Sequence, residues 1–259
     1  MAVPVMLRYT EREARGWLKL WKAWVFSFFV VPLLFLGGIG LGLGSYVDSG
    51  TGSGSVGSFD YLTFVAPGLL AGGVMQNMTG DGLWGVMGGH KWQGTFNAAV
   101  ASPLRPADVF GGWLLWRGVM SGASAVSFVV TAALLGAVPS VWGVLAVPAA
   151  VLCALTFSSL LAAWSITRDT DGSFPVIFRI VIMPMFVFSG TFFPLSDLPS
   201  AIRPLAWATP LWHVVELCRG ATTGTLGLVE GVGHTAYLAT AIALGCLLAG
   251  RGFTRRLAA

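Results

Sequence analysis

Charged residues are scarce in this chain. Of its 259 residues only 10% are charged, whereas 55% are hydrophobic. A soluble globular domain carries roughly 25% charged residues, which it needs to cover its surface. The 35 Gly and 11 Trp are typical of membrane proteins, in which Gly is frequent in spanning helices and Trp lies at headgroup level. The composition therefore excludes a water-soluble domain and predicts an integral membrane protein made of helices.

Cysteine is also rare. The three cysteines, Cys153, Cys218 and Cys246, are far apart, and none belongs to a CxxC pair or lies near a histidine at ligand spacing. This pattern excludes a disulfide framework and a zinc site. Two of the three fall inside apolar runs, where a cysteine usually acts as a small packing residue. We therefore interpret all three as structural and expect no metal site.

Nucleotide-binding and hydrolase motifs are missing. None of Lys19, Lys22 and Lys91 is followed by Ser or Thr, so no GxxxxGK[ST] phosphate-binding loop occurs. The Gly-rich residues 37–44 do not fit GxGxxG and follow a hydrophobic run, which favours helix packing. Neither GxSxG nor HExxH is present. We expect no ATP hydrolysis by this chain and no bound cofactor, and an intramembrane enzyme has no positive support.

Basic side chains gather in short patches beside apolar runs. The net charge is +4, and this distribution favours anionic headgroups over nucleic acid as the partner. Residues 7–22 place five Lys and Arg on one helical face and apolar side chains on another, which predicts an amphipathic helix in the membrane interface. Thr10 and Glu13 form a potential capping box, which would start this helix near Glu11.

Six stretches are predicted to cross the membrane as helices. They are residues 23–47, 61–86, 113–138, 141–167, 174–193 and 231–250. The first is too long for a signal peptide, whose apolar region has roughly 7–15 residues. The Gly- and Ser-rich residues 48–58 predict a flexible outer loop. Residues 194–230 are neither apolar enough to cross nor polar enough for an ordinary loop, so we predict an outer re-entrant or interfacial hairpin.

The third and fourth spans follow from one long uncharged run. No charged residue occurs between Arg117 and Arg168. A single helix of that length would far exceed the roughly 30 Å thickness of a hydrocarbon core. Pro139 and Ser140 are the obvious turn. The two spans are therefore predicted to form a hairpin with both arginines on the same side.

The orientation follows from the distribution of Lys and Arg. The predicted inner segments carry the amino-terminal patch and Lys91, Arg105, Arg168, Arg251, Arg255 and Arg256. The predicted outer segments carry only Arg203 and Arg219. Cytoplasmic loops carry the excess of positive charge, so both termini are expected in the cytoplasm of a multi-pass, bacterial plasma-membrane protein.

Two segments carry a more specific signal. The first is PMFVFSGTFFPLSDLP at residues 184–199 with PLWHVVELCRG at residues 210–220, and the second is KWQGTFNAAVASPLRPADVFGGWLLWR at residues 91–117. Together they resemble the permeases of type-2 ABC exporters, in particular the branch of nodulation lipo-oligosaccharide and daunorubicin-type exporters. The resemblance covers nearly the whole chain. It implies one permease domain over residues 1–259, a second permease, same or homologous, and two separate ATPase subunits that hold ATP and Mg.

By this resemblance residues 92–101 form the coupling helix that docks on the ATPase. Trp92 and Phe96 are four residues apart and could share one face toward the partner, and Pro103 would stop the helix. Arg105 could contact the ATPase or an anionic headgroup. An ordinary solvated inner loop is the alternative, and residues 168–171 are a weaker second candidate for ATPase contact.

The resemblance also marks an outer turn, which contains Phe192, Phe193, Pro194 and Pro199. His213, Glu216 and Arg219 are spaced by three and could share a helical face. We expect them to form a local salt-bridge cluster that pins the hairpin, with a direct role at the substrate as the alternative.

Asp81 is a carboxylate near the inner end of the second span. A charge in mid-membrane costs about 2.5–3.5 kcal/mol, so it should face protein, water or a cation. Arg117 is one candidate partner, and an aqueous inner interface is the alternative.

The function expected from this resemblance is the ATP-driven export of an amphipathic molecule such as a drug, a lipid or a lipo-oligosaccharide. A secondary transporter would typically show two weakly repeated halves. No such repeat is visible, and that class, with an intramembrane enzyme, is the alternative. The sequence does not indicate which molecule is carried.

Overall fold

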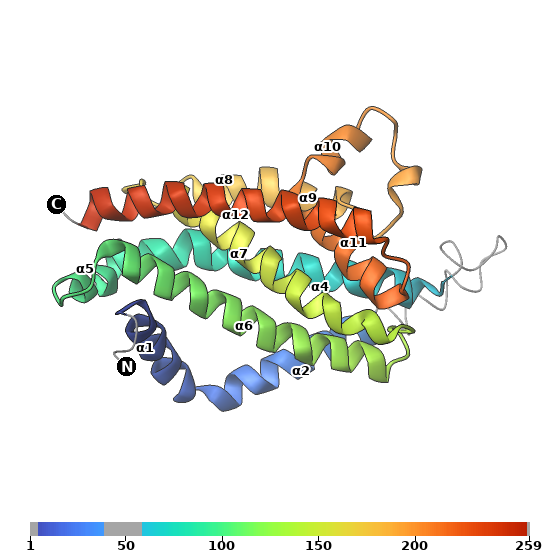
Figure 1. Cartoon of the computed structure of the whole chain (residues 1–259), viewed down its shortest axis with the longest axis horizontal. Helices are drawn as coiled ribbons and strands as arrows, with labels where there is room; N and C mark the ends of the chain where they lie inside the picture. Colours follow the sequence, from blue (N-terminus) through green and yellow to red (C-terminus); the bar gives the residue numbers. More distant parts are fainter. Residues whose placement is uncertain (1–4, 39–58, 258–259) are drawn as a thin grey trace.

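The computed structural model describes residues 5–38 and 59–257, which are almost entirely helical. The helices are α1 (Val5–Leu18), α2 (Trp21–Gly37), α4 (Tyr61–Gly80), α5 (Thr95–Val100), α6 (Pro106–Leu134), α7 (Ala146–Ser165), α8 (Phe174–Ile177), α9 (Met183–Phe188), α10 (Arg203–Trp207), α11 (Pro210–Thr223) and α12 (Leu228–Leu257). The long helices run side by side along one axis (Figure 1). α5 and the end of α12 lie at one end of this bundle, and the turn between α6 and α7 lies at the other.

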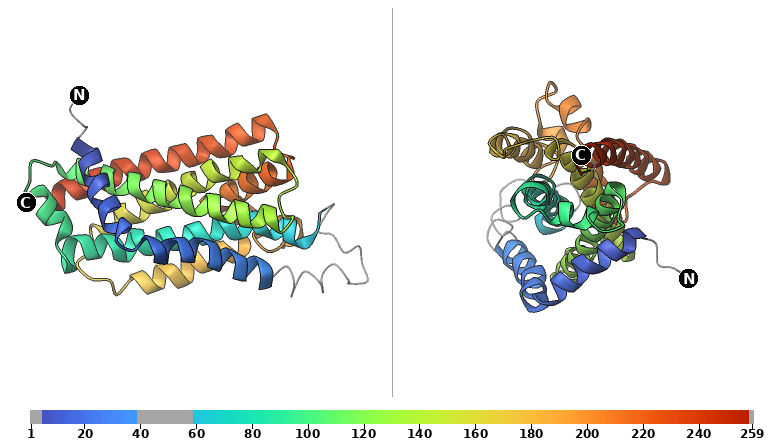
Figure 2. Two further views of the ribbon diagram at one scale, coloured as in Figure 1. Left: turned by 90° about the horizontal axis from the view of Figure 1, so that it is seen from below. Right: turned by 90° about the vertical axis from the view of Figure 1, so that its left-hand side faces the viewer.

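The first two helices meet at a bend of 80°. α1 lies across one end of the bundle and α2 runs along its side (Figure 2). Thr10 is already inside α1, and its hydroxyl donates to the backbone oxygen of Gly112 at 3.1 Å and to that of Met6. The predicted helix start near Glu11 is therefore wrong, because Thr10 bonds to α6 and to its own helix instead of capping.

The third long helix extends beyond its predicted end at residue 86. α4 continues through two π-helical segments, Asp81–Gly85 and Gly88–Trp92. Gly94 separates this helix from α5, with a φ of 64° that glycine adopts without steric cost. The predicted helix over residues 92–101 is therefore broken, since Trp92 belongs to one helix and α5 has only six residues.

α6 and α7 form an antiparallel hairpin. α6 ends at Leu134, and the 3-10 segment Val141–Leu145 leads into α7. The Ser140 hydroxyl accepts a hydrogen bond from the backbone N–H of Trp142 at 3.2 Å, which caps this segment. The turn thus contains Pro139 and Ser140, where the sequence places it.

α8 and α9 belong to one helix, Phe174–Phe188. It ends before the predicted residue 193 because the chain turns at Gly190, whose φ is 79°. The short 3-10 segment Leu195–Asp197 and α10 follow, and α10 projects from the side of the bundle (Figure 1). α11 then returns to pack against α4, α7 and α12.

Three helices are long and apolar enough to cross a membrane: α6, the combined Val141–Ser165, and α12. The bent pair α1 and α2 adds a fourth if it is one span. The helix Phe174–Phe188 is shorter than 18 residues, and α4 carries Gln76 and Asn77 among its apolar side chains. Residues 39–58, which hold the end of the predicted first span and the outer loop, lie outside the described part. The all-helical membrane class is confirmed, and the count of six spans stays a prediction.

Small side chains allow the central helices to approach closely. Ala150, Cys153 and Ala154 of α7 are fully buried, as is Cys218 of α11. Cys153 and Cys218 each direct their thiol to a backbone oxygen of a neighbouring helix. All three cysteines are free, and Cys246 is half-buried. These contacts fit the packing role that the sequence predicts.

Candidate functional site

A groove of about 1380 Å³ lies along the side of the bundle, between α1, α2, α4, α6 and α9. Charged side chains line one end and apolar side chains line the other. The charged residues are Arg8, Glu11, Arg12, Glu13, Arg15, Lys19, Asp81 and Arg117. A groove with two such ends is chemically suited to a molecule that is itself amphipathic.

The apolar end is built from long helices. Phe28 and Phe35 of α2 lie across from Leu70 of α4 and Phe128 of α6, and Phe186 of α9 completes the wall. Uncharged polar side chains lie between the two ends: Ser27, Gln76, Asn77, Ser121 and Ser124. Aromatic and aliphatic walls suit a hydrocarbon tail, whereas amides and hydroxyls suit sugar or amide groups.

An ionic cluster sits at the charged end. Arg117 of α6 donates to Asp81 at 2.8 Å and to Glu13 of α1 at 3.0 Å. Its guanidinium also lies 5.5 Å from the ring centre of Trp113. The structure thus joins the two residues that sequence reasoning marked as a candidate pair, Asp81 and Arg117. Because the cluster ties α1 to two long helices, it fixes α1 at the charged end of the groove.

Glu13 was missed as a member of this cluster. Sequence reasoning used it only as part of a helix cap, and nothing in the local pattern reveals a contact with a helix about a hundred residues away. The signal that could have revealed this contact is the number of donors on Arg117. Its guanidinium carries five N–H groups, and Asp81 alone cannot accept from all of them. Its Nε remains buried without a hydrogen-bond partner in the described structure.

The inner segment after α4 is arranged differently from the prediction. Trp92 is 59% exposed, but Phe96 is only 2% exposed. The Phe96 ring packs on Tyr9 of α1 and Phe253 of α12, with ring centres 6.4 and 5.4 Å apart. A Cβ added at Gly89 would lie 2.6 Å from this ring, so glycine makes room for it. The prediction that Phe96 faces a partner is therefore wrong, because the break at Gly94 turns it into the core.

A second groove of about 610 Å³ lies between α1 and the α5 region. Its lining residues are Arg8, Tyr9, Arg12, Thr95, Ala98, Ala99, Ser102, Pro103 and Leu104. Pro103 is exposed and follows the end of α5, and Arg105 immediately precedes α6. The Arg105 backbone N–H donates to the Asp108 carboxylate at 3.2 Å, and the Arg105 residue is exposed. The accessible face of the inner segment is thus this groove and Trp92.

An exposed carboxylate connects three segments at the α5 end of the bundle. Asp169 lies 3.2 Å from Lys91 and 3.3 Å from Arg256 near the end of α12. Arg256 also donates to the backbone oxygen of Thr167 at 2.7 Å. The hydrogen bond from Lys91 and the charge of Arg256 lower the pKa of Asp169. Residues 168–171, the weaker predicted ATPase contact, therefore form part of an ionic link between inner ends.

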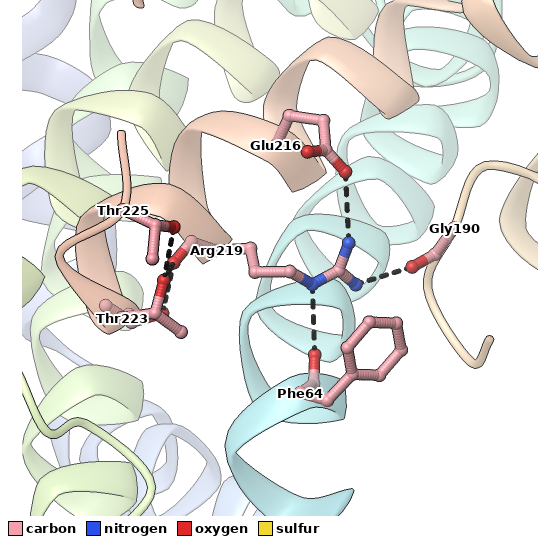
Figure 3. A network of polar contacts seen from close by, with 7 residues as sticks. Phe64, Gly190, Glu216, Arg219, Thr223 and Thr225 are labelled. Atoms are coloured by element: carbon pink, nitrogen blue, oxygen red, sulfur yellow. Dashed lines mark hydrogen bonds and ion pairs between the residues drawn. The ribbon is translucent and has the colours of Figure 1, made fainter. Parts of the chain in front are cut away.

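Arg219 organises the outer turn (Figure 3). Its guanidinium donates to the backbone oxygens of Gly190 at 2.5 Å and Phe64 at 3.3 Å and to Glu216 at 3.0 Å. It also lies 4.0 Å from the ring centre of Phe64. α11 is thereby tied to α4 and to the turn that follows α9. Glu216 and Arg219 form the expected pair, although most of the contacts of Arg219 are to backbone oxygens.

His213 does not join this pair. Its Nδ1 lies 2.8 Å from the Nδ1 of His234, and its ring stacks on Tyr237 with centres 3.8 Å apart. Tyr237 also donates to the backbone oxygen of Ala208 at 2.6 Å. The predicted three-residue cluster is thus corrected: His213 faces α12, whereas Glu216 and Arg219 face the outer turn. Sequence reasoning missed His234 and Tyr237, which lie in a later helix.

The aromatic and proline residues of the outer turn pack against its neighbours. Phe192 lies 5.1 Å from the ring of Phe186 in α9, and Phe193 is half-buried. Pro194 begins the 3-10 segment in an extended conformation, and the Pro199 oxygen accepts from a later backbone N–H. The turn therefore reaches the apolar end of the groove through Phe192 and Phe186. Among the described residues no group of three or more His, Cys, Asp or Glu could hold a metal ion.

Comparisons with known proteins agree on one family. The profile of the ABC-2 type transporter matches residues 11–222. Nodulation protein J of Rhizobium leguminosarum bv. trifolii is 28% identical over 83% of this chain and 79% of its own length. Nodulation protein J of Sinorhizobium fredii is 29% identical over 82% of this chain and 78% of its own length. That of Azorhizobium caulinodans is 29% identical over 80% and 79%, respectively.

Proposed function

Because the chain belongs to the ABC-2 type transporter family, we propose that it is the permease of an exporter that moves an amphipathic molecule out of the cytoplasm or inner leaflet. ATP hydrolysis is supplied by separate ATPase subunits, two per complex, since this sequence has no phosphate-binding loop. A second permease, same or homologous, completes the complex. Both termini and the α5 end of the bundle face the cytoplasm of a bacterium.

The observation that carries this proposal is the two-ended groove of about 1380 Å³. Its charged end adjoins α1, which has the composition of an interfacial helix, and its apolar end lies among the long helices. A molecule with a polar head and a hydrocarbon tail can occupy both ends at once. Drugs, lipids and lipo-oligosaccharides all have this character.

The second groove is the proposed entry point for the work of ATP hydrolysis. It lies at the α5 end and is lined by small side chains of α5 and by Arg8 and Arg12 of α1. A helix or loop of the ATPase could seat there, beside the exposed Trp92. Because Phe96 links α5 to α1 and α12, a push on α5 would reach the helix that borders the substrate groove.

The test is retention of the ATPase and ATP-driven transport by the purified complex. Ala98 is exposed and lines the second groove, so Ala98→Glu should insert normally but lose the ATPase on purification and lose export. Thr254→Glu is the matched control, because Thr254 is exposed at the same end of the bundle but outside both grooves.

Two results would contradict this proposal. If Ala98→Glu retains the ATPase and transports as the parent does, the second groove is not the docking site. If the parent chain transports an amphiphile without any ATPase and depends on an ion gradient instead, the chain is a secondary transporter.

A further inference from the structure

The carboxylates at the charged end of the substrate groove already have partners. Glu11 pairs with Arg15 at 2.5 Å. Glu13 and Asp81 both pair with Arg117, at 3.0 and 2.8 Å. No other carboxylate lines the groove among the described residues. A cationic head would therefore have to compete with the arginine that already neutralises each carboxylate, so these carboxylates offer it little net attraction.

The cations at the same end are not all paired. Arg8 and Lys19 line the groove, and within the described residues neither lies in an ion pair. Arg8 also lines the second groove, whereas Lys19 lines only the first. Lys19 sits at the bend between α1 and α2, where the charged wall meets the apolar wall. It is therefore an unneutralised charge that belongs to the substrate groove alone.

We infer that the molecule carried in this groove is an anionic amphiphile, and that Lys19 is the residue that selects its negative head. The head lies beside Lys19, and the hydrocarbon tail lies along Phe28 and Phe35 of α2. This inference rests on the proposed function, which assigns the groove to the substrate. Near the membrane interface the effective dielectric constant is lower than in water, so a free cation attracts an anion strongly.

The middle of the groove is lined by uncharged polar side chains. Ser27, Gln76 and Asn77 lie between the charged and apolar ends, and their hydroxyl and amide groups suit neutral polar groups next to the charged one. A membrane phospholipid shares the chemistry of an anionic head and apolar tail. We assign the groove to the transported molecule, and the experiment below distinguishes that molecule from a resident phospholipid.

Three hexadecyl amphiphiles serve as probes: hexadecyl phosphate, hexadecyl maltoside and hexadecyltrimethylammonium, each brominated at the end of the tail. Trp17, Trp24 and Trp116 line the groove, so bromine in the tail should quench their fluorescence. Binding is measured on the complex in phosphatidylcholine nanodiscs, and ATP-driven export of each probe is measured in phosphatidylcholine vesicles. We expect the phosphate probe to bind about tenfold more tightly than the ammonium probe, a preference that decreases in high salt.

Charge variants then identify the selecting residue. Lys19→Gln should remove most of the preference for hexadecyl phosphate, and Lys19→Glu should reverse it toward the ammonium probe. Lys22→Glu is the matched control, because Lys22 is a nearby exposed cation outside the groove. It should behave as the parent does.

The outcomes separate this inference from the proposed function. Equal binding of the three probes, or a preference unchanged in Lys19→Glu, would overturn the inference. Export of the ammonium probe in preference to the phosphate probe would also overturn it and leave the exporter function in place. Binding of the phosphate probe without export, while another probe is exported, would show a resident lipid and overturn the inference. Export of none of the probes, with no ATPase retained, would count against the exporter itself.

Discussion

Phe96 is a residue whose burial determines what its substitution does. Its ring lies between Tyr9 and Phe253 and is 2% exposed. Phe96→Asp would remove the ring from this aromatic cluster and place a carboxylate there instead, at a cost of about 3 kcal/mol. We expect the variant to aggregate at a lower temperature than the parent does. The measurement is the fraction of protein that stays monodisperse after heating in detergent.

Trp92→Asp provides the comparison. Trp92 is nearby in the chain but 59% exposed, so its substitution should leave the melting temperature close to that of the parent. A Phe96→Asp protein as stable as Trp92→Asp would refute the burial of Phe96 and reopen its assignment to a docking face.

Arg219 and Glu216 form a pair in which the two members have unequal weight. If Glu216 is removed, Arg219 keeps its hydrogen bonds to two backbone oxygens. Because Glu216 is half-exposed, the free energy of unfolding should fall by only about 1 kcal/mol. If Arg219 is removed, three acceptors lose their donor. The free energy of unfolding should then fall by about 3 kcal/mol. We therefore expect Arg219→Met to lower the melting temperature more than Glu216→Gln.

Arg219→Lys distinguishes a planar fork of donors from a simple positive charge. An ammonium group cannot reach oxygens from three different segments at once. The melting temperature of Arg219→Lys should therefore lie between those of Arg219→Met and the parent. Equal melting temperatures for Glu216→Gln and Arg219→Met would indicate that only the ion pair matters. In transport assays Glu216→Gln and Arg219→Met should show an unchanged preference among the probes, because Arg219 does not line the groove.

Some of these residue contacts were predictable and others were not. Asp81 and Arg117 are rare charges at the borders of apolar runs, and such charges need partners, so their pairing could be anticipated. The burial of Phe96 depends on the φ of one glycine, Gly94, which no helical periodicity reveals. The separation of His213 from Glu216 depends on where α12 lies, which is a tertiary fact.

At the scale of elements, the helix ends near α5 are joined by an exposed ionic link. Asp169 contacts both Lys91, at the end of the α4 helix, and Arg256, near the end of α12. Its pKa is lowered by these cations, so the carboxylate is charged at neutral pH and the link is complete there. The stabilising contribution is present above the ordinary pKa of an aspartate and is lost as the pH falls through the lowered value.

Asp169→Asn mimics the protonated state at neutral pH. We expect faster hydrogen exchange in the last turns of α12, because Arg256 loses its carboxylate partner while it keeps the Thr167 oxygen. Asp171→Asn is the control, since Asp171 is exposed in the same loop and has no ion pair in the described structure. Identical exchange in Asp169→Asn and the parent would mean that the link is formed too rarely to matter.

The accuracy of the predicted elements followed the strength of the local signals. The turn at Pro139 and Ser140 was predicted because an uncharged run longer than a bilayer must reverse, and proline marks the place. The helix predicted over residues 174–193 ends early, at Phe188, because a glycine turn precedes Pro194. α1 begins earlier than predicted, because the contact of Thr10 with α6 is not a local property.

At the scale of the whole molecule, the two ends of the bundle carry different charges. The end with α5 also holds α1 and the last turns of α12, where most Lys and Arg of the described chain lie (Figure 1). The opposite end holds the turn between α6 and α7, and residues 134–145 there contain no charged residue. By the positive-inside tendency the α5 end is predicted to be cytoplasmic.

Labelling of single added cysteines tests this orientation. Ser140 lies in the turn between α6 and α7 and is half-buried, and Ser102 lies exposed at the α5 end. A membrane-impermeant maleimide should therefore label Ser140→Cys in intact cells, and Ser102→Cys only in inverted vesicles. The background is low because the native Cys153 and Cys218 are fully buried, and Cys246→Ser removes the half-buried third thiol.

The result depends on whether α6 crosses the membrane. α6 leads from the neighbourhood of Ser102 to the turn at Ser140, and its 29 residues rise about 44 Å, which exceeds a hydrocarbon core of about 30 Å. The two positions must therefore lie on opposite sides if α6 crosses the membrane. Labelling of both from the same side would mean that α6 does not span, and reversed labelling would place the proposed ATPase groove outside the cell, where no ATPase could reach it.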